Sequence, residues 1–82
     1  MVNKVAYHNN FEKKFKKIDP SFKDEIKTQI IKIINNPEIG KPMRYVRKGT
    51  REVYIGPFRL SYKYEKKANT IVILAFYHKD EQ

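Results

Sequence analysis

Cationic and aromatic side chains are interleaved between residues 41 and 63 of this 82-residue chain, and Glu52 is the single acid among them. Lys and Arg neutralise phosphates, and unpaired bases stack on aromatic rings, so the two residue types together suit a polyanion that carries bases. Strand-like alternation in this segment predicts that these side chains lie on a rigid sheet. The cations are Lys41, Arg44, Arg47, Lys48, Arg51, Arg59 and Lys63, and the aromatic residues are Tyr45, Tyr54, Phe58 and Tyr62.

The charge balance of the whole chain favours an anionic partner. Eighteen Lys and Arg residues against nine Asp and Glu residues give a net charge of +9, which attracts nucleic acid, an acidic protein or a membrane surface. A genome-wide bias toward Lys is an alternative explanation for the lysines of residues 13–17. It explains the 41–63 segment less well, because Arg supplies four of the seven cations there and a guanidinium can make a bidentate contact with phosphate.

Several kinds of active site are disfavoured by what the chain lacks. It has no cysteine, and therefore neither a thiolate nucleophile nor a disulfide. His8 and His78 are its only histidines, and it has no Gly-rich phosphate loop and no HExxH motif. We therefore expect no metal and no other cofactor. No apolar run approaches the roughly 18 residues of a membrane span, so we expect a soluble cytoplasmic protein that does not use a membrane.

Cationic chemistry remains, and metal-free cleavage of RNA is a reaction that it can support. The 2′-hydroxyl must lose a proton and attack the adjacent phosphorus, and the 5′-oxygen must gain a proton as it leaves. Arg and Lys stabilise the extra charge on the phosphorane, while Tyr, His or Lys can move the protons. The candidate catalytic residues are Arg51, Tyr54, Arg59, His78 and Lys79. The candidate RNA-binding residues are Lys41, Arg44, Arg47, Lys48, Lys63 and Tyr77.

Several of these candidates also have an ordinary structural explanation. Arg59 could be a solvated strand residue paired with Glu65 or Glu52. His78 could be a polar residue at a strand end, and Lys79 could form surface ion pairs with the acids that follow it. Alternation favours a functional position for Arg59, since it projects away from the face on which the neighbouring apolar residues lie.

Two segments with helical spacing precede the cationic segment. The first ends before Asp19-Pro20, because Pro disfavours helical geometry in the residue before it. The second runs from about residue 20 to Asn35 and stops at Asn36-Pro37. The short connection predicts an antiparallel helical hairpin. The two apolar stripes are Phe11, Phe15 and Ile18, and Phe22, Ile26, Ile30 and Ile33.

Strands are predicted at both ends of the chain. Residues 2–7 could form a short opening strand, and residues 51–55, 58–64 and 70–78 form three more, separated by turns at Gly56-Pro57 and at residues 66–69. The expected fold is α+β: one domain over residues 1–82, with the helical hairpin packed on one face of a three- to four-stranded, mainly antiparallel sheet. The other face would be left free for Arg59 and its neighbours.

With these elements in order, the chain resembles the RelE/ParE superfamily of toxins from type II toxin–antitoxin systems. The resemblance covers nearly the whole chain. REVYIGPFRLSYKY is similar to the strand–turn–strand of the family, in which an aromatic–Arg pair opens the second strand. FYHKDE is similar to its closing strand and the basic residue that follows. The helical part of the resemblance is FEKKFKKIDPSFKDEIKTQIIKIINNP.

RelE-type members are ribosome-dependent endoribonucleases that cut mRNA in the decoding A site without a metal. The resemblance therefore implies an mRNA interferase that inhibits translation, with mRNA and ribosomal RNA as partners. It implies that Arg59 matches the phosphate-stabilising Arg of the family. It also implies that Lys79 lies at or beside the position of a second catalytic Arg, with His78 adjacent to it.

This chain departs from the nuclease pattern at two places. Where some nucleases have paired lysines before the turn, it has Arg51, Glu52 and Tyr54. The Tyr or His of the C-terminal extension has no match, so Tyr54, Tyr77 or His78 would have to replace it.

The family resemblance further implies a cognate antitoxin, an acidic and partly disordered protein that folds on the toxin. Two other functions stay open. ParE-type members share the fold and poison DNA gyrase, so this chain could be a gyrase inhibitor without nuclease activity. It could also be a degenerate, non-catalytic module that still binds RNA or its antitoxin.

Overall fold

The computed structural model describes residues 2–81. Within them, five strands form one sheet in the order β1-β5-β4-β3-β2. β1 pairs in parallel with β5, and the other neighbours are antiparallel. The predicted α+β fold with two helices on a mainly antiparallel sheet is confirmed, with one strand more than the three to four expected. The strands are β1 (Lys4–Tyr7), β2 (Lys41–Pro42), β3 (Arg51–Ile55), β4 (Phe58–Glu65) and β5 (Thr70–His78).

The helices are α1 (Asn9–Lys16) and α2 (Pro20–Asn35), and both begin at a side-chain cap. His8 Nδ1 accepts a hydrogen bond from the backbone N of Asn10 at 3.1 Å. Asp19 Oδ1 accepts from the backbone N of Ser21 at 2.9 Å, and Pro20 occupies the first helical position, where its missing N–H costs nothing. The predicted boundary at Asp19-Pro20 is therefore confirmed, because the same dipeptide ends one helix and starts the next.

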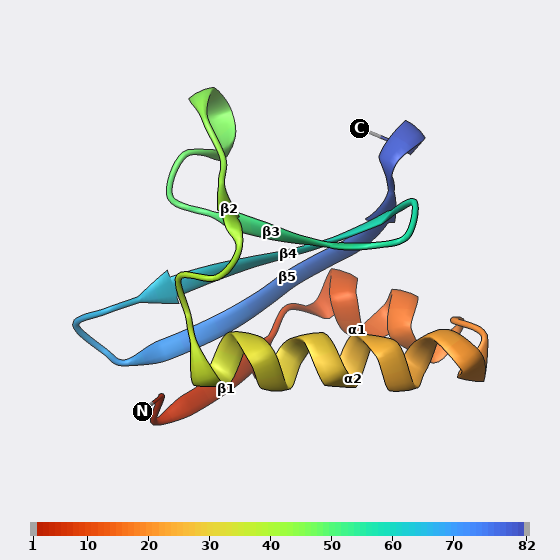
Figure 1. The fold of residues 1–82 in the computed structure, drawn as a ribbon, viewed down its shortest axis with the longest axis horizontal. Helices are drawn as coiled ribbons and strands as arrows, with labels where there is room; N and C mark the ends of the chain where they lie inside the picture. The colour runs from red at the N-terminus through yellow and green to blue at the C-terminus, as the bar shows by residue number, and fades with distance from the viewer. Residues whose placement is uncertain (1, 82) are drawn as a thin grey trace.

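The helices cover one face of the sheet, which we call the helix face, and leave the other, the open face, uncovered. Figure 1 shows both helices on one side of the sheet, while the loop after β2 and the C-terminal turn rise on the other side. The core lies between the helices and the helix face. Its buried residues are Phe11, Ile26, Ile30, Ile33, Ile55, Leu60, Tyr62, Ile71, Ile73 and Phe76.

Tyr62 also fixes the connection from α2 to the sheet. Its buried hydroxyl accepts from the backbone N of Gly40 at 2.9 Å and donates to the carbonyl of Pro37 at 2.7 Å. Burial raises the pKa of this phenol, so the hydroxyl keeps the proton that it donates. A Cβ on Gly40 would lie 2.7 Å from the Tyr62 ring, so only glycine lets the connector approach this closely.

A bulge in β5 decides which residues of its last half reach the open face. Tyr62 pairs with Ile73, but the preceding Ser61 pairs with Ala75, so Leu74 is an extra residue in the ladder. The bulge reverses the alternation beyond it. Tyr77 consequently lies opposite Arg59 on the open face, whereas uninterrupted alternation from Ile73 would have turned it toward the helices.

Candidate active site

Three side chains form a row across the open face. The register pairs Tyr54 of β3 with Arg59 of β4, and Arg59 with Tyr77 of β5. Directly opposed residues of antiparallel strands share a face. The Arg59 guanidinium lies 4.0 Å from the centre of the Tyr54 ring, a cation–π contact, and its Nη1 donates to the carbonyl of Phe58 at 3.2 Å. Arg59 is thereby held in one place while Tyr54 remains 53% exposed.

Arg59 is not neutralised by a carboxylate in the part of the chain that the structure describes. Glu52 is taken by Arg47 and Glu65 by Lys63, so neither of the two acids that could have balanced Arg59 does so. The positive charge of Arg59 is thus available to an external anion, which is the property expected of a phosphate-stabilising group.

The next row holds a buried acid. Glu52 is only 3% exposed, although it lies on the face that the helices leave open. Its Oε2 accepts from Arg47 Nη1 at 3.2 Å and from the hydroxyl of Tyr77, and Arg47 Nη1 also donates to that hydroxyl at 2.6 Å. Arg47 covers the Tyr77 ring at 5.3 Å. This triad ties the loop after β2 to the open face and balances the charge of Arg47. We call the triad together with Tyr54 and Arg59 the open-face cluster: Arg47, Glu52, Tyr54, Arg59 and Tyr77.

A hollow of about 420 Å³ lies beside the cluster. Its floor is formed by Ser61, Ala75 and Tyr77 of the open face, and its wall by Val46 and Arg47 of the loop. The Tyr77 ring can support a base there, but the charge of Arg47 is balanced by Glu52 and the acid Glu81 also lines the hollow, so a phosphate has to bind outside it. Tyr77 lines the hollow and lies opposite Arg59 in the sheet, so the hollow and Arg59 are neighbours on the open face.

The other predicted RNA-binding cations lie on β2, on β4 and in the loop between β2 and β3. Lys41 lies opposite Glu52 in the β2–β3 pair and is exposed. Lys63 shares the open face with Arg59 and makes an exposed ion pair with Glu65 at 3.2 Å, which is worth little in water. Arg44 and Lys48 are exposed in the loop, on either side of the 3₁₀ turn η1 (Tyr45–Arg47).

The structure does not bring Arg51 and His78 to Arg59. Arg51 lies opposite Tyr62 on the helix face, where its Nη1 donates to the carbonyls of Glu38 and Gly40 at 3.1 and 2.8 Å. His78 lies opposite Phe58 and packs edge-on against it at 5.3 Å. Both side chains occupy the alternation phase of the core residues, so their catalytic roles stay predictions without geometric support.

Lys79 is at the same end of the sheet as Arg59. It begins the 3₁₀ turn η2 (Lys79–Glu81), and its backbone N donates to the carbonyl of Pro57 at 2.9 Å, next to the start of β4. Its side chain is exposed. In the same turn, a hydrogen bond from the backbone N of His78 lowers the pKa of Glu81, which also pairs with Lys14 at 3.3 Å. This placement is compatible with the prediction that Lys79 lies at the margin of the site.

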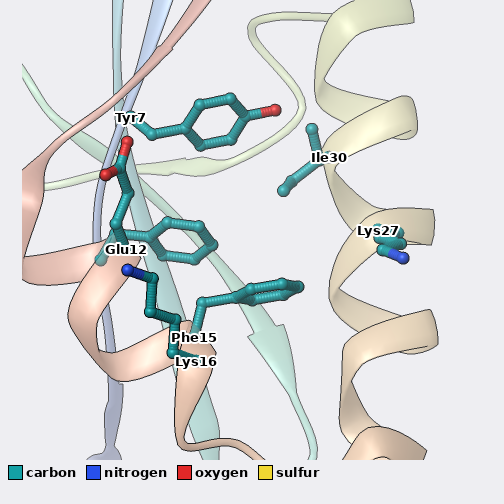
Figure 2. A pocket seen from close by; sticks show the side chains of 7 residues that line it. Tyr7, Glu12, Phe15, Lys16, Lys27 and Ile30 are labelled. Atoms are coloured by element: carbon teal, nitrogen blue, oxygen red, sulfur yellow. The ribbon is translucent and has the colours of Figure 1, made fainter.

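A second surface, which we call the helical groove, lies between α1 and α2. It encloses about 330 Å³ and is lined mostly by apolar side chains, with three charged residues among them. Figure 2 shows the rings of Tyr7 and Phe15 projecting from one wall toward Ile30 of α2 on the other. The lining residues are Tyr7, Phe11, Glu12, Phe15, Lys16, Lys27 and Ile30.

Sequence reasoning missed Glu52 as the residue that organises the open face. The available signal was its isolation, because it is the single acid among seven cations. Its burial depends on Arg47 and Tyr77, which are distant in sequence. Within residues 2–81, no helix is long and apolar enough to cross a membrane, and no group of three or more His, Asp or Glu side chains is arranged to hold a metal ion.

Comparisons with known proteins place this fold among bacterial and archaeal toxins. Residues 5–82 match the model of the ParE toxin of type II toxin–antitoxin system, parDE. The toxin–antitoxin complex RelBE2 from Mycobacterium tuberculosis contains a chain that is 24% identical, with a TM-score of 0.84 and coverage of 95% of this chain and 99% of that one. No curated protein matches the sequence.

Two further solved structures share the fold at lower identity. The YoeB/ParE toxin from Agrobacterium tumefaciens is 12% identical, with a TM-score of 0.82 and coverage of 92% of this chain and 96% of that one. The archaeal RelE–RelB complex from Pyrococcus horikoshii contains a chain that is 16% identical, with a TM-score of 0.76 and full coverage of both chains. The expected RelE/ParE superfamily is confirmed: the chain belongs to the ParE toxin family of type II toxin–antitoxin systems.

Proposed function

We propose that this toxin inhibits translation by cutting mRNA in the decoding site of the ribosome, without a metal. The observation that carries the proposal is Arg59, a guanidinium fixed on the Tyr54 ring with no carboxylate partner in residues 2–81. We would expect a group that only stabilised the fold to be paired with a carboxylate, as Arg47 is with Glu52 and Arg51 is with Glu38.

The proposed reaction is attack of a ribose 2′-hydroxyl on the adjacent phosphorus. The P–O5′ bond breaks, and the products are a 2′,3′-cyclic phosphate and a free 5′-hydroxyl. Arg59 stabilises the charge of the phosphorane, which is commonly the largest contribution to such catalysis. One proton leaves the 2′-hydroxyl and another reaches the 5′-oxygen. We assign the proton transfers to Tyr54 and Lys79, which lie at the same end of the sheet as Arg59.

The remaining cations hold the substrate in this proposal. Lys63 binds a phosphate beside the scissile position, and Tyr77 supports the base in the hollow. Arg51 and His78 would have to leave their contacts on the helix face to take part, so we assign them to the fold. The site of action would be the cytoplasm, where ribosomes are found.

We further propose a cognate antitoxin as partner. The solved relatives from M. tuberculosis and P. horikoshii are complexes of a toxin with its antitoxin. The helical groove offers Phe15 and Ile30 to apolar side chains, and Lys16 and Lys27 to acidic ones. An acidic, partly disordered segment that folds on binding complements this surface and the +9 charge of the chain.

Inhibition of DNA gyrase is the second candidate function. It is favoured by the match to the ParE toxin model and by the replacement of the paired lysines of some nucleases with Arg51, Glu52 and Tyr54. In that case the two helices would contact gyrase, and the open face would serve the antitoxin alone.

One induction experiment separates these functions. The toxin is expressed without antitoxin, the 5′ ends of translated and untranslated mRNA are mapped, and covalent gyrase–DNA complexes are measured in the same cells. We expect new 5′ ends within the codons of translated mRNA only. Accumulated gyrase–DNA complexes with intact mRNA would overturn this proposal and indicate gyrase inhibition. Normal growth would indicate a non-catalytic module.

A further inference from the structure

The loop between β2 and β3 is closed by its own backbone hydrogen bonds. Met43 N donates to the carbonyl of Thr50 at 3.0 Å at its base, and Lys48 N donates to the carbonyl of Tyr45 at 3.0 Å near its tip. Arg47 anchors it to Glu52 and Tyr77. Figure 1 shows this loop rising from the sheet on the side opposite the helices. Its tip is therefore held at a defined position away from the body of the protein.

The tip presents apolar side chains to solvent. Tyr45 is 88% exposed and Val46 is 100% exposed. Tyr45 also has a φ of 59°, a left-handed conformation that is uncommon for a bulky residue and that costs energy. An exposed ring on a strained backbone adds nothing to the stability of the free protein. Its geometry suits a contact with another molecule.

A hollow beside the tip has the chemistry of a nucleotide site. It encloses about 620 Å³, within the range of roughly 300–1,000 Å³ that is common for ligand pockets. Lys41 and Arg44 supply positive charge, and neither has an ion pair among the residues that the structure describes. Pro42, Met43 and the Tyr45 ring supply apolar surface. We call this the loop hollow.

We propose that the loop hollow binds a nucleotide of RNA at a position outside the cleavage site, with its base stacked on Tyr45 and its phosphate on Lys41 and Arg44. The choice of RNA rests on the proposed function, under which the RNA would be ribosomal. RNA fits better than an acidic protein, because an aromatic ring between two unpaired cations serves base and phosphate separately. The contact would dock the toxin so that the mRNA meets Arg59.

The test compares Tyr45→Asn with Tyr45→Phe, each combined with Arg59→Ala so that RNA stays intact. Asn tolerates positive φ, so Tyr45→Asn removes the ring without rebuilding the loop, while Tyr45→Phe keeps the ring. Binding to ribosomes with an empty decoding site and to a single-stranded RNA oligonucleotide is measured. We expect Tyr45→Asn to weaken binding by roughly 5- to 150-fold, as for loss of one stacked base. Tyr45→Phe should bind like the parent.

Ile31→Ala is the matched control, because Ile31 is a 58% exposed apolar residue on α2 and should not affect RNA binding. Equal RNA binding by the Asn and Phe variants would overturn the proposal. So would a loss of antitoxin or gyrase binding in Tyr45→Asn with RNA binding intact. If the toxin with its native Arg59 cuts no mRNA but Tyr45→Asn still loses the oligonucleotide, the proposed function fails and the loop hollow stands.

Discussion

The two faces of the sheet use the same residue types for opposite purposes. Arg51 and Arg59 both lie on strands beside a tyrosine, but Arg51 on the helix face is held by the carbonyls of Glu38 and Gly40, and by Glu38 Oε2 at 3.6 Å. Arg59 on the open face stacks on Tyr54 and has no carboxylate partner within residues 2–81. It is held by this stacking and by one hydrogen bond to the carbonyl of Phe58, but its charge is not balanced.

The tyrosines differ in the same way. Tyr62 is fully buried on the helix face, and its hydroxyl makes hydrogen bonds with the backbone of Gly40 and Pro37. Tyr54 on the open face has a largely exposed ring. For these two tyrosines, burial under the helices accompanies a role in the fold, and exposure on the open face leaves the ring available to a ligand.

The largest effect on stability should come from Ile73 of β5, and the adjacent Val72 is its control. Ile73→Ala removes a side chain that is 0% exposed and should cost about 2–5 kcal/mol. Val72→Ala, on the partly exposed open face, should cost about 1.5 kcal/mol or less, since roughly 0.8 kcal/mol per buried CH₂ applies only in part. Denaturant unfolding measures both. Equal losses of unfolding free energy would mean that Val72 is as well packed as Ile73, which would contradict an uncovered open face.

Glu52→Gln should lower stability by about 1.5–3 kcal/mol, the contribution of a hydrogen bond to a charged group, because Arg47 and Tyr77 lose their buried anion. Glu65→Gln is the control, since its pair with Lys63 is exposed and should contribute less than about 1 kcal/mol. Thermal or urea unfolding measures the loss of stability in each variant. Equal losses in Glu52→Gln and Glu65→Gln would refute the role of Glu52.

Tyr62→Phe should cost about 1–3 kcal/mol, because the backbone N of Gly40 and the carbonyl of Pro37 are left without their partner. Tyr64→Phe, on the same strand, should change the free energy of unfolding little. The connector amides should exchange faster with solvent in Tyr62→Phe than in the parent, which hydrogen exchange can measure. Unchanged exchange at Gly40 would contradict the assigned hydrogen bond.

The smallest effect concerns pH. Hydrogen bonds from the backbone and then the side chain of Ser21 lower the pKa of Asp19 below its ordinary value. The stabilisation is therefore complete above the unfolded value of about 3.9 and is lost as the pH falls through the lower folded value. Asp19→Asn caps the helix without titrating. The stability advantage of the parent over Asp19→Asn should shrink in that acid range, and an advantage that grew on acidification would contradict the cap.

Much of the fold could be predicted, because long elements repeat their pattern several times. The bounds of α2 and β3 follow from apolar spacing and from Pro or Gly at their ends, and those of β5 from its apolar run after the polar turn at residues 66–69. The two-residue β2 and the parallel pairing of β1 with β5 could not be predicted. A strand of two residues is too short to show alternation. The pairing of β1 with β5 joins opposite ends of the chain, so no local pattern indicates it.

The site was harder to predict than the fold. Alternation correctly places Tyr54 and Arg59 on one face. The same alternation puts Arg51 with Val53 and Ile55 on the helix face, so only its charge, and not its position, makes Arg51 a candidate. The faces of Tyr77 and His78 depend on the bulge at Leu74, and no local signal in an apolar strand reveals a bulge.

The rate of mRNA cleavage by purified toxin on programmed ribosomes, compared between Arg59→Ala and Lys32→Ala, tests the central claim most directly. Both variants lose one positive charge, but Lys32 is exposed on α2, away from the open face. Arg59→Ala should reduce the rate about 10²- to 10³-fold, as for loss of a transition-state hydrogen-bond donor, with Lys32→Ala close to the parent. Cleavage by Arg59→Ala at the rate of the parent would contradict the account.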